Sequence, residues 1–413
     1  MKQLITDTLL KHYAALVVKL GINLQKGQPV IIRCPVEDFA FARIVQKAAY
    51  IAGASNVVMD WVDSEMMKDF YLHASEEAMN NFPDSSVARF KEWDDAGAAY
   101  INVITETPDL FNEVCPSKIS RFTKAMRTKL KVHYQKTRAY ENRWCIIAIP
   151  SKAWARKIFP HLMEAEALEY LWKLILKGAR ADGENPIKDW ELHGKHFIHR
   201  INFLNDNQFK VLHFTNSIGT NLKIGMPENH RYIGGGVVSK DGIIFYPNIP
   251  TEEIFTAPHK YKVNGKMVAS KPLIYAENII ENLVLYFKDG EIVDYSASTG
   301  QDIFKSLLKV DEGSRYLGEI ALVSSSSPLS QANTLFYNTM FDENTGCHIG
   351  IGNANPSNIQ SVSTLTDEEL EAAGMNVSLQ LTNVTFGTSD MEVAGIKEDN
   401  KKVVIMKNGD FQI

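Results

Sequence analysis

Three side chains of the types that hold divalent metal ions stand between residues 248 and 351. Glu253 follows the run Ile-Pro-Thr-Glu, Glu319 lies within an apolar run, and His348 follows a cysteine. Carboxylate oxygens and one imidazole suit Zn²⁺, Co²⁺ or Mn²⁺. Such an ion activates a bound water molecule. The residue types therefore predict a metal site that activates water.

Each of these residues has a structural alternative. Thr251-Glu252-Glu253 is typical of a helix start, with the threonine as N-cap and acids in the first turn. His348 has small and apolar neighbours, where a neutral, hydrogen-bonded core histidine is the alternative. Glu319 is harder to explain in this way, because a carboxylate in an apolar strand is costly unless it is paired or bound to a metal.

Several long strings, spread over nearly the whole chain, resemble one enzyme family. They occur in the same order as in the thermophilic-type metalloaminopeptidases, the group of aminopeptidase T, aminopeptidase S and PepS. The strings span residues 13–25, 151–160, 288–294, 311–319, 336–344 and 407–410. Agreement of unrelated strings in order is a specific signal, so the chain is identified as a member of this family.

The resemblance assigns roles to four residues of the second half. It implies that Glu253, Glu319 and His348 are metal ligands, and that Glu343 is an acid used at the site as general base. Small peptides are the implied substrates, and a homodimer with an enclosed cavity is the implied assembly. With this resemblance, we favour a metal site, active or vestigial, over a purely structural role.

Three other family positions carry different residues here. Asn355 stands where the family has a tyrosine, and Leu381 and Asn383 stand where it has histidine and aspartate. The alignment is anchored just downstream by Gly387-Thr-Ser-Asp390.

The chemistry of these replacements predicts a weakened site. Leucine has no lone pair to donate, and asparagine offers a neutral oxygen where aspartate offers a charged one. Loss of the phenol at Asn355 removes a donor for the tetrahedral oxyanion, a loss that can cost ~3 kcal/mol. We therefore expect one bound divalent metal ion (Zn, Co or Mn) or none, in place of a two-metal site.

Two classes of function follow from this reading. The first is a metal-dependent aminopeptidase that releases N-terminal residues, with an impaired or altered site. The second is an inactive paralogue that binds peptides or regulates. A narrower third option is a one-metal enzyme of different chemistry, because the ring-cleaving dihydroxypyridine dioxygenases resemble this fold and use a single Fe²⁺.

Composition sets the frame for these functions. The chain has 413 residues, enough for two domains, with 45% hydrophobic and 23% charged residues as in ordinary globular proteins. A net charge of −5 argues against nucleic acid as a partner. No apolar run reaches the roughly 18 residues of a membrane span, and the N-terminus is not typical of a signal peptide. The four cysteines lack paired spacing and predict idle thiols. We expect a cytoplasmic protein without membrane partners.

Apolar periodicity predicts an α/β first half. Helices are expected over residues 2–21 and 36–53 and over the stretch 151–205, which is broken at 183–186. Strands are expected at residues 29–33, 56–61, 98–104 and 144–149. Strands that alternate with helices predict a mainly parallel sheet covered on both faces.

The second half differs in character. Short strands are expected at residues 209–215, 219–224, 242–246, 283–287 and 291–295, the last two joined as a hairpin by Lys288-Asp-Gly290. Helices are expected at 300–308 and 367–373. The sequence thus predicts a mainly parallel α/β domain over residues 1–206 and an α+β domain rich in antiparallel strands over 207–413, which carries the site.

Two clusters of basic or metal-type residues receive structural interpretations. The run 124–133 is most simply one solvated helix face, because its lysines and arginines alternate with Ala, Met and Leu. His193, His196 and His199 fall three apart without a carboxylate in the run, so we expect surface or packing positions and no metal site.

Overall fold

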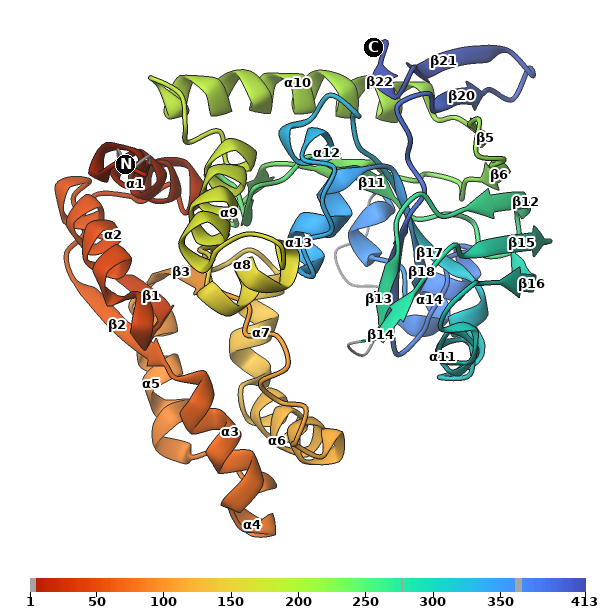
Figure 1. Ribbon diagram of the computed structural model, residues 1–413. Coiled ribbons are helices and arrows are strands. Elements are labelled where there is room, and N and C mark those ends of the chain that lie inside the picture. The colour runs from red at the N-terminus through yellow and green to blue at the C-terminus, as the bar shows by residue number, and fades with distance from the viewer. Residues whose placement is uncertain (1–4, 276–277, 361–365) are drawn as a thin grey trace. The chain divides into compact units, whose positions relative to one another are not determined.

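The computed structural model describes residues 5–275, 278–360 and 366–413 of the chain, and Figure 1 shows its elements. The chain divides into two compact units. The first comprises Met1–Glu191 with Gly236–Pro250, and the second comprises Leu192–Gly235 with Thr251–Ile413. The expected change of character at residues 205–208 falls at the end of helix α10 (Pro186–Asn207).

A five-stranded parallel sheet is the centre of the first unit. Its strand order is β10-β4-β3-β1-β2, so the chain reverses direction across the sheet between β1 and β3. The strands are β1 (Val30–Pro35), β2 (Val57–Val62), β3 (Ala99–Ile104), β4 (Trp144–Ala148) and β10 (Asn248–Ile249). All four predicted strands are present, and the predicted parallel sheet is confirmed.

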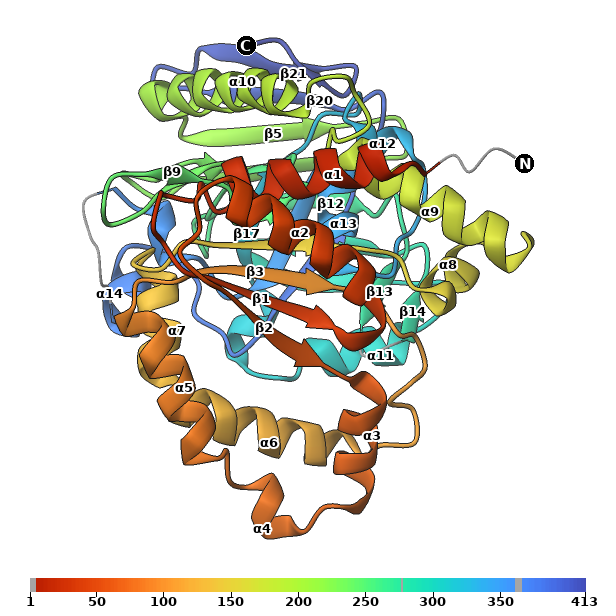
Figure 2. The ribbon, with the colours of Figure 1, turned by 90° about the vertical axis from the view of Figure 1, so that its left-hand side faces the viewer.

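Helices cover both sides of this sheet, as Figures 1 and 2 show for α1 and α2 on one side and α6 and α7 on the other. In α2 the buried residues Phe41, Val45 and Ala49 recur every four positions and form one apolar face. The helices are α1 (Asp7–Leu16), α2 (Phe39–Ile51), α3 (Ser64–His73), α4 (Glu76–Met79), α5 (Asp84–Asp95), α6 (Pro116–Lys129), α7 (Lys131–Arg138), α8 (Lys152–Ile158) and α9 (Glu164–Gly178).

The basic run 124–133 is not one solvated helix face, and that prediction is wrong. Helix α6 ends at Lys129 and α7 begins at Lys131, with the buried Leu130 between them. On α7, Nδ1 of His133 lies 3.0 Å from the carboxylate of the buried Asp94. The alternation of basic and apolar residues does not reveal this break, and the pairing of His133 with Asp94 is a long-range contact.

Antiparallel sheets form most of the second unit, as predicted. The eight-stranded sheet has the order β16-β15-β12-β6-β5-β20-β21-β22. Its strands are β5 (Val211–Thr215), β6 (Asn221–Gly225), β12 (Val263–Val268), β15 (Val284–Lys288), β16 (Glu291–Ser296), β20 (Glu392–Ile396), β21 (Lys402–Lys407) and β22 (Asp410–Phe411). The predicted hairpin between β15 and β16 is confirmed, with positive φ at Asp289 and Gly290 as a tight two-residue turn requires.

A second, five-stranded sheet has the order β19-β18-β17-β11-β7. Its strands are β7 (Ile233–Gly234), β11 (Ile254–Thr256), β17 (Leu317–Leu322), β18 (His348–Gly352) and β19 (Leu381–Thr385). The main helices of this unit are α11 (Gln301–Leu307), α12 (Pro328–Gln331), α13 (Thr339–Asp342) and α14 (Asp367–Ala372). No helix in the described part of the chain is long and apolar enough to cross a membrane.

The histidines of α10 confirm their structural interpretation. His193 is buried, and its Nε2 lies 2.9 Å from the carbonyl oxygen of Thr251. His196 and His199 are exposed. The four cysteines are free, and all except Cys115 are buried.

We predict that the buried carboxylate of Asp94 stabilises the first unit in a pH-dependent way. Burial raises its pKa, but hydrogen bonds from His133 and Tyr100 outweigh burial, and the pKa lies below its ordinary value of 3.8. A carboxyl group whose pKa is lower in the folded state stabilises the fold when the pH is above its unfolded-state pKa. This stabilisation is lost as the pH falls through the folded-state pKa. Asp94→Asn should therefore cost about 2 kcal/mol at pH 7 and reduce the acid sensitivity below about pH 4.

Urea unfolding at pH 7 and at pH 3.5 measures both effects. Asp95→Asn is the matched control. Asp95 is the next residue, and its exposed carboxylate pairs with Lys91 and Lys136 at the surface. An equal loss of stability in the two variants would contradict the role of burial.

Candidate metal centre

Strand register brings the candidate residues onto one face of the five-stranded sheet. Glu319 of β17 pairs with Gly350 of β18, which pairs with Asn383 of β19. His348 begins β18, two residues before Gly350. Directly opposed residues of antiparallel strands share a face, and so do residues two apart along one strand. Glu319, His348 and Asn383 therefore project to the same side.

Glu253 reaches this face from a short segment that precedes β11. Residues 251–253 are not helical and lead directly into the strand, so the alternative of a helix start at Thr251 is wrong. The segment is held at two points. The backbone N–H of Glu252 donates to Oδ1 of the buried Asn344 (2.6 Å), and His193 contacts the carbonyl oxygen of Thr251. Asn344 is thus a positioning residue for Glu253.

The three predicted ligands converge. Nε2 of His348 lies 3.2 Å from Oε2 of Glu253 and 3.5 Å from Oε1 of Glu319. One ligand atom from each residue lies within 4.8 Å of the others. The side chains are 0%, 15% and 11% exposed for His348, Glu253 and Glu319. Such spacing leaves room for one cation among three donor atoms.

The orientation of His348 suits a ligand. Its Nδ1 lies 3.2 Å from the carbonyl oxygen of Gly346, a contact in which Nδ1 donates. Donation at Nδ1 assigns the tautomer whose Nε2 lone pair faces the two carboxylates. A histidine held in this way presents Nε2 to a metal.

Unpaired acceptor atoms at the cluster support the same conclusion. Oε2 of Glu253 and Nε2 of His348 face each other at 3.2 Å, and these two atoms and Oδ1 of Asn383 are buried without any other partner within the described residues. Buried polar atoms without partners are costly in native structures. A divalent cation supplies a common partner for oxygen and imidazole donors, so the donor set fits one such ion.

The two positions at which the family resemblance leads us to expect histidine and aspartate lie beside this cluster. Asn383 lies opposite Gly350, and Leu381 lies opposite Gly352 on the same strand pair. A Cβ atom at Gly350 would approach Cδ1 of Leu381 to 2.7 Å, Cβ of Glu319 to 2.8 Å and Oδ1 of Asn383 to 3.0 Å. Glycine at 350 therefore lets these side chains meet.

Asn355 has a local structural role. Its side-chain oxygen accepts from the backbone N–H of Ser357 (3.0 Å) and caps the short 3₁₀ helix Pro356–Asn358. This capping bond accounts for an asparagine here and does not supply a phenol donor to the cluster.

Glu343 completes a group of three carboxylates around one imidazole. Its Oε2 accepts from Nδ2 of Asn383 at 3.2 Å. Burial and the charges of Glu253 and Glu319 raise the pKa of Glu343 well above its ordinary value, against the opposing effect of His348. Burial likewise raises the pKa of Glu319, and Glu253 adds to it.

The pKa of His348 is governed by the neighbouring carboxylates more than by burial. Burial lowers its pKa, but the two glutamates outweigh burial and hold it well above the ordinary value. In the absence of a cation a proton is therefore favoured at Nε2. Proton and metal compete for one lone pair.

A cavity of about 330 Å³ borders Glu343, Leu381 and Asn383. Its wall includes Lys271, whose Nζ is buried without a hydrogen-bond partner in the described structure. Burial lowers the pKa of Lys271 to about 8, against the attraction of Asp342. Sequence reasoning missed Lys271 and Asn344. Neither belongs to a motif, and only the fold brings them to the site.

Comparison with known proteins gives consistent matches over almost the whole chain. The family model for thermophilic metalloproteases (M29) matches residues 6–411. Aminopeptidase AmpS of Bacillus subtilis is 39% identical over 402 residues, which cover 97% of this chain and 98% of that protein. Aminopeptidase T of Thermus thermophilus is 34% identical over 404 residues, with 97% coverage of both.

Solved structures agree with these matches. The structure of wild-type AmpT from Thermus thermophilus matches with a TM-score of 0.90 and 32% identity, covering 98% of this chain and 99% of that chain. A 2,5-dihydroxypyridine dioxygenase from Pseudomonas putida matches with a TM-score of 0.50 and 10% identity, covering 98% and 96%, and shows likeness of fold alone.

We predict that the effect of Glu319 on the stability of the protein depends on whether a metal ion is bound. With Zn²⁺ present at about 100 times Kd, a ligand-linked stabilisation of ~3 kcal/mol is expected in the wild type and should be lost in Glu319→Gln. With a chelator present, Glu319→Gln should be as stable as the wild type or more stable, because it removes the cost of burying a charge.

Thermal melts of both proteins, each with metal and with chelator, measure this. Glu312→Gln is the control, since that glutamate is exposed on the preceding segment. Wild-type melting that responds to neither metal nor chelator would rule out a metal at this cluster.

Proposed function

The chain belongs to the thermophilic metalloprotease family M29, whose members matched above indicate a metallo-aminopeptidase, and we propose that its site holds one divalent metal ion in place of two. The proposed activity is the release of N-terminal residues from small peptides, with turnover impaired by the altered site. The observation that carries the proposal is the convergence of Glu253, Glu319 and His348 beside Leu381 and Asn383.

One ion fits the remaining ligands better than two. Glu253, Glu319 and His348 provide two charged oxygens and a nitrogen, a set used by Zn²⁺, Co²⁺ and Mn²⁺. When bound, such an ion polarises a carbonyl oxygen and activates water. A second ion would depend on Leu381, which has no donor atom, and on the neutral amide of Asn383.

Glu343 is the proposed general base. Its carboxylate lies beside the ligand cluster and is oriented by the amide of Asn383 at 3.2 Å. It would take a proton from the attacking water and return it to the departing amine. The raised pKa of Glu343 favours its protonated form when no metal is bound, and a nearby cation favours the ionised form that a base requires.

The cavity beside Glu343 is the proposed place of the peptide. Its volume of about 330 Å³ stands at the small end of ligand pockets. The cation of Lys271 in its wall opposes a protonated N-terminal amine, which in a two-metal site would be held by the second ion. This repulsion is a further reason to expect weak turnover.

The same features favour a second candidate function. A protein that retains the cavity but lacks a second set of metal ligands can bind peptides without cleaving them. Lys271 would pair with a peptide carboxylate, and Leu381 would contact an apolar side chain. A one-metal enzyme of different chemistry is the third option, and likeness to the dioxygenase supports it by fold alone. A homodimer and a cytoplasmic location stay proposals carried by the family resemblance.

We expect at most one metal ion per chain after incubation with Zn²⁺, Co²⁺ or Mn²⁺ followed by desalting. Hydrolysis of leucyl and alanyl p-nitroanilides should be slower than that of aminopeptidase T from Thermus thermophilus by ~10²–10³-fold or more, since one missing oxyanion donor already has this effect. Elemental mass spectrometry and parallel assays measure both. Two tightly bound ions with fast turnover would exclude the altered site.

Restoring the lost ligands should restore metal binding. Leu381→His with Asn383→Asp should raise metal affinity by about tenfold or more, because ligand number and charge dominate the binding of divalent ions. Adding Asn355→Tyr should then be required for a gain in turnover. Isothermal titration with Zn²⁺ and the p-nitroanilide assay measure the two steps.

Leu379→His is the matched control for the added imidazole, since Leu379 is 87% exposed and lies just before β19. It should leave the Zn²⁺ titration unchanged. No gain in affinity from the double substitution would show that the surroundings of the ligands have also diverged.

A further inference from the structure

A second cavity lies wholly within the first unit, apart from every residue of the candidate metal centre. Its volume is about 900 Å³, at the large end of small-molecule sites. One wall is a face of the parallel sheet, and the other is formed by helices α3, α5, α6 and α7. The cavity is open to solvent, and its size and its mixture of apolar and polar groups are those of a ligand pocket.

The polar residues of the sheet wall stand in one row. Arg33 of β1 pairs in register with Asp60 of β2 on one side and with Asn102 of β3 on the other. Their side chains share a face, and all three line the cavity. The row crosses from β1 to β3, where the strand order reverses. In open parallel sheets ligands bind at such a reversal, near the carboxyl ends of the strands.

Two arginines share one carboxylate at this wall. Nη1 of Arg33 lies 2.9 Å from Oδ2 of Asp60, and Nη2 of Arg89 lies 3.2 Å from Oδ1 of the same residue. Asp60 is 8% exposed, whereas the arginine side chains are 47% and 49% exposed. One carboxylate cannot use all the donors of two guanidinium groups, so this group carries an excess positive charge with N–H donors open to a ligand.

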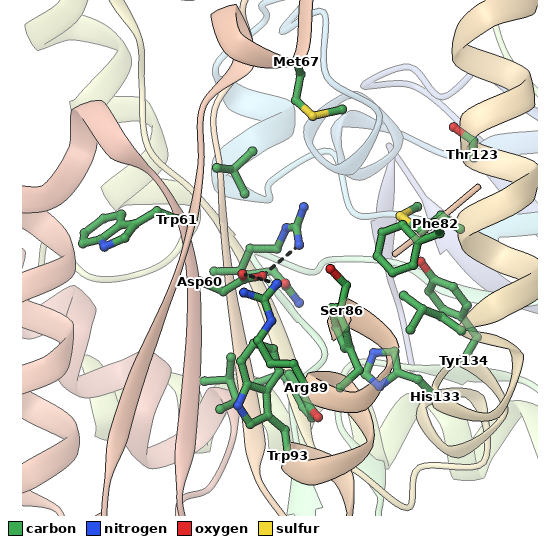
Figure 3. Close-up of a pocket in the computed structure, with 18 of the residues that line it drawn as sticks. Asp60, Trp61, Met67, Phe82, Ser86, Arg89, Trp93, Thr123, His133 and Tyr134 are labelled. Atoms are coloured by element: carbon green, nitrogen blue, oxygen red, sulfur yellow. Dashed lines mark hydrogen bonds and ion pairs between the residues drawn. The ribbon is translucent and has the colours of Figure 1, made fainter. Parts of the chain in front are cut away.

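Arg89 is held in place on a second side. Its guanidinium stands 4.9 Å from the ring centroid of Trp93. Figure 3 shows Asp60 and Arg89 at this wall, with Phe82, His133 and Tyr134 across from them. A fixed guanidinium favours planar, two-pronged binding of a carboxylate.

The remaining wall combines aromatic rings with separated polar groups. Tyr71, Phe82, Phe122 and Tyr134 provide apolar surface, and Ser86 and Thr123 provide hydroxyl groups. The buried indole N–H of Trp144, on the sheet wall, has no hydrogen-bond partner in the described chain. Rings for side chains, with hydrogen-bonding groups between them, suit a peptide better than a plain hydrocarbon chain.

Phosphate is a poor candidate for the anion. The segment after β1 is the short 3₁₀ helix Val36–Asp38, which has neither the glycines nor the lysine of a phosphate-binding loop. Asp63 lines the cavity as a second acid, but its carboxylate accepts from the N–H of Met66 (2.9 Å) and caps α3. The arginine pair is thus the cationic centre of this wall.

We propose that this cavity binds a short apolar peptide through its C-terminal carboxylate, with Arg33 and Arg89 as the carboxylate site. This is a binding site separate from the proposed peptidase centre, and it stands or falls independently of the metal.

The probe pair is N-acetyl-Leu-Phe and its C-terminal amide, which differ only in the carboxylate and lack the free amine of an aminopeptidase substrate. Titration calorimetry on the full chain, with chelator present, should show binding of the acid about tenfold tighter than of the amide, as charge-assisted hydrogen bonds require.

Two substitutions should act in opposite directions. Arg89→Gln should weaken binding of the acid about tenfold and leave the amide nearly unchanged. Asp60→Asn should tighten binding of the acid, because it frees both guanidinium groups. Arg43→Gln is the control, since Arg43 is an exposed arginine of the same unit that does not line the cavity. Melting temperatures confirm that each variant is folded.

Lys271→Met separates this cavity from the one beside Glu343, whose wall holds the buried Nζ of Lys271. It should leave the acid's affinity unchanged. The proposal is overturned by absence of binding at millimolar probe, by equal affinity for acid and amide, or by a loss of binding in Lys271→Met that Arg89→Gln does not reproduce.

Discussion

One buried and two half-buried carboxylates beside one imidazole are the electrostatic constraint on which the site of the second unit depends. Glu253, Glu319 and Glu343 cannot all stay ionised around His348, because each charge is costly without water and repels the others. The charge can be balanced by protons or by a cation. The raised pKa values of His348 and Glu343 indicate that protons balance the charge when no cation is bound. The buried atoms without other partners indicate where a cation would bind. The sheet register and the bond from Asn344 keep the four groups together in either state.

The altered residues shift this balance in a consistent way. An aspartate at 383 would add a fourth negative charge, which only a second cation would offset. Asn383 removes that charge and donates its amide to Glu343 instead. Leu381 fills the adjacent space with methyl groups that need no partner. The two residues suit each other. Aspartate at 383 beside Leu381 would leave a negative charge without a cation, and histidine at 381 beside Asn383 would leave an imidazole without a metal ion to bind. This arrangement supports the proposed one-cation site.

The sequence predicted the elements that local pattern controls. The apolar run around Glu319 gave β17, and the periodicity of residues 36–53 gave α2. Glu253 illustrates the limit. Its local context favours a helix start, but long-range contacts from Asn344 and His193 hold the segment extended. Lys271 carried no local signal at all. Its importance comes from burial beside Asp342 and Glu343, which only the packing of distant segments determines.

The cavity of the first unit shows the same dependence on distant segments. Arg33, Asp60 and Arg89 come from β1, β2 and α5, and each alone is an ordinary charged residue. Only the parallel register places Asp60 beside Arg33, and only α5 brings Arg89 to the other oxygen. A single carboxylate facing two guanidinium groups is an incomplete charge pairing, as three carboxylates facing one imidazole are in the second unit. In both places side chains of one charge outnumber the oppositely charged partners that they contact. These two groups are the reason for proposing a carboxylate ligand in the first unit and a cation in the second.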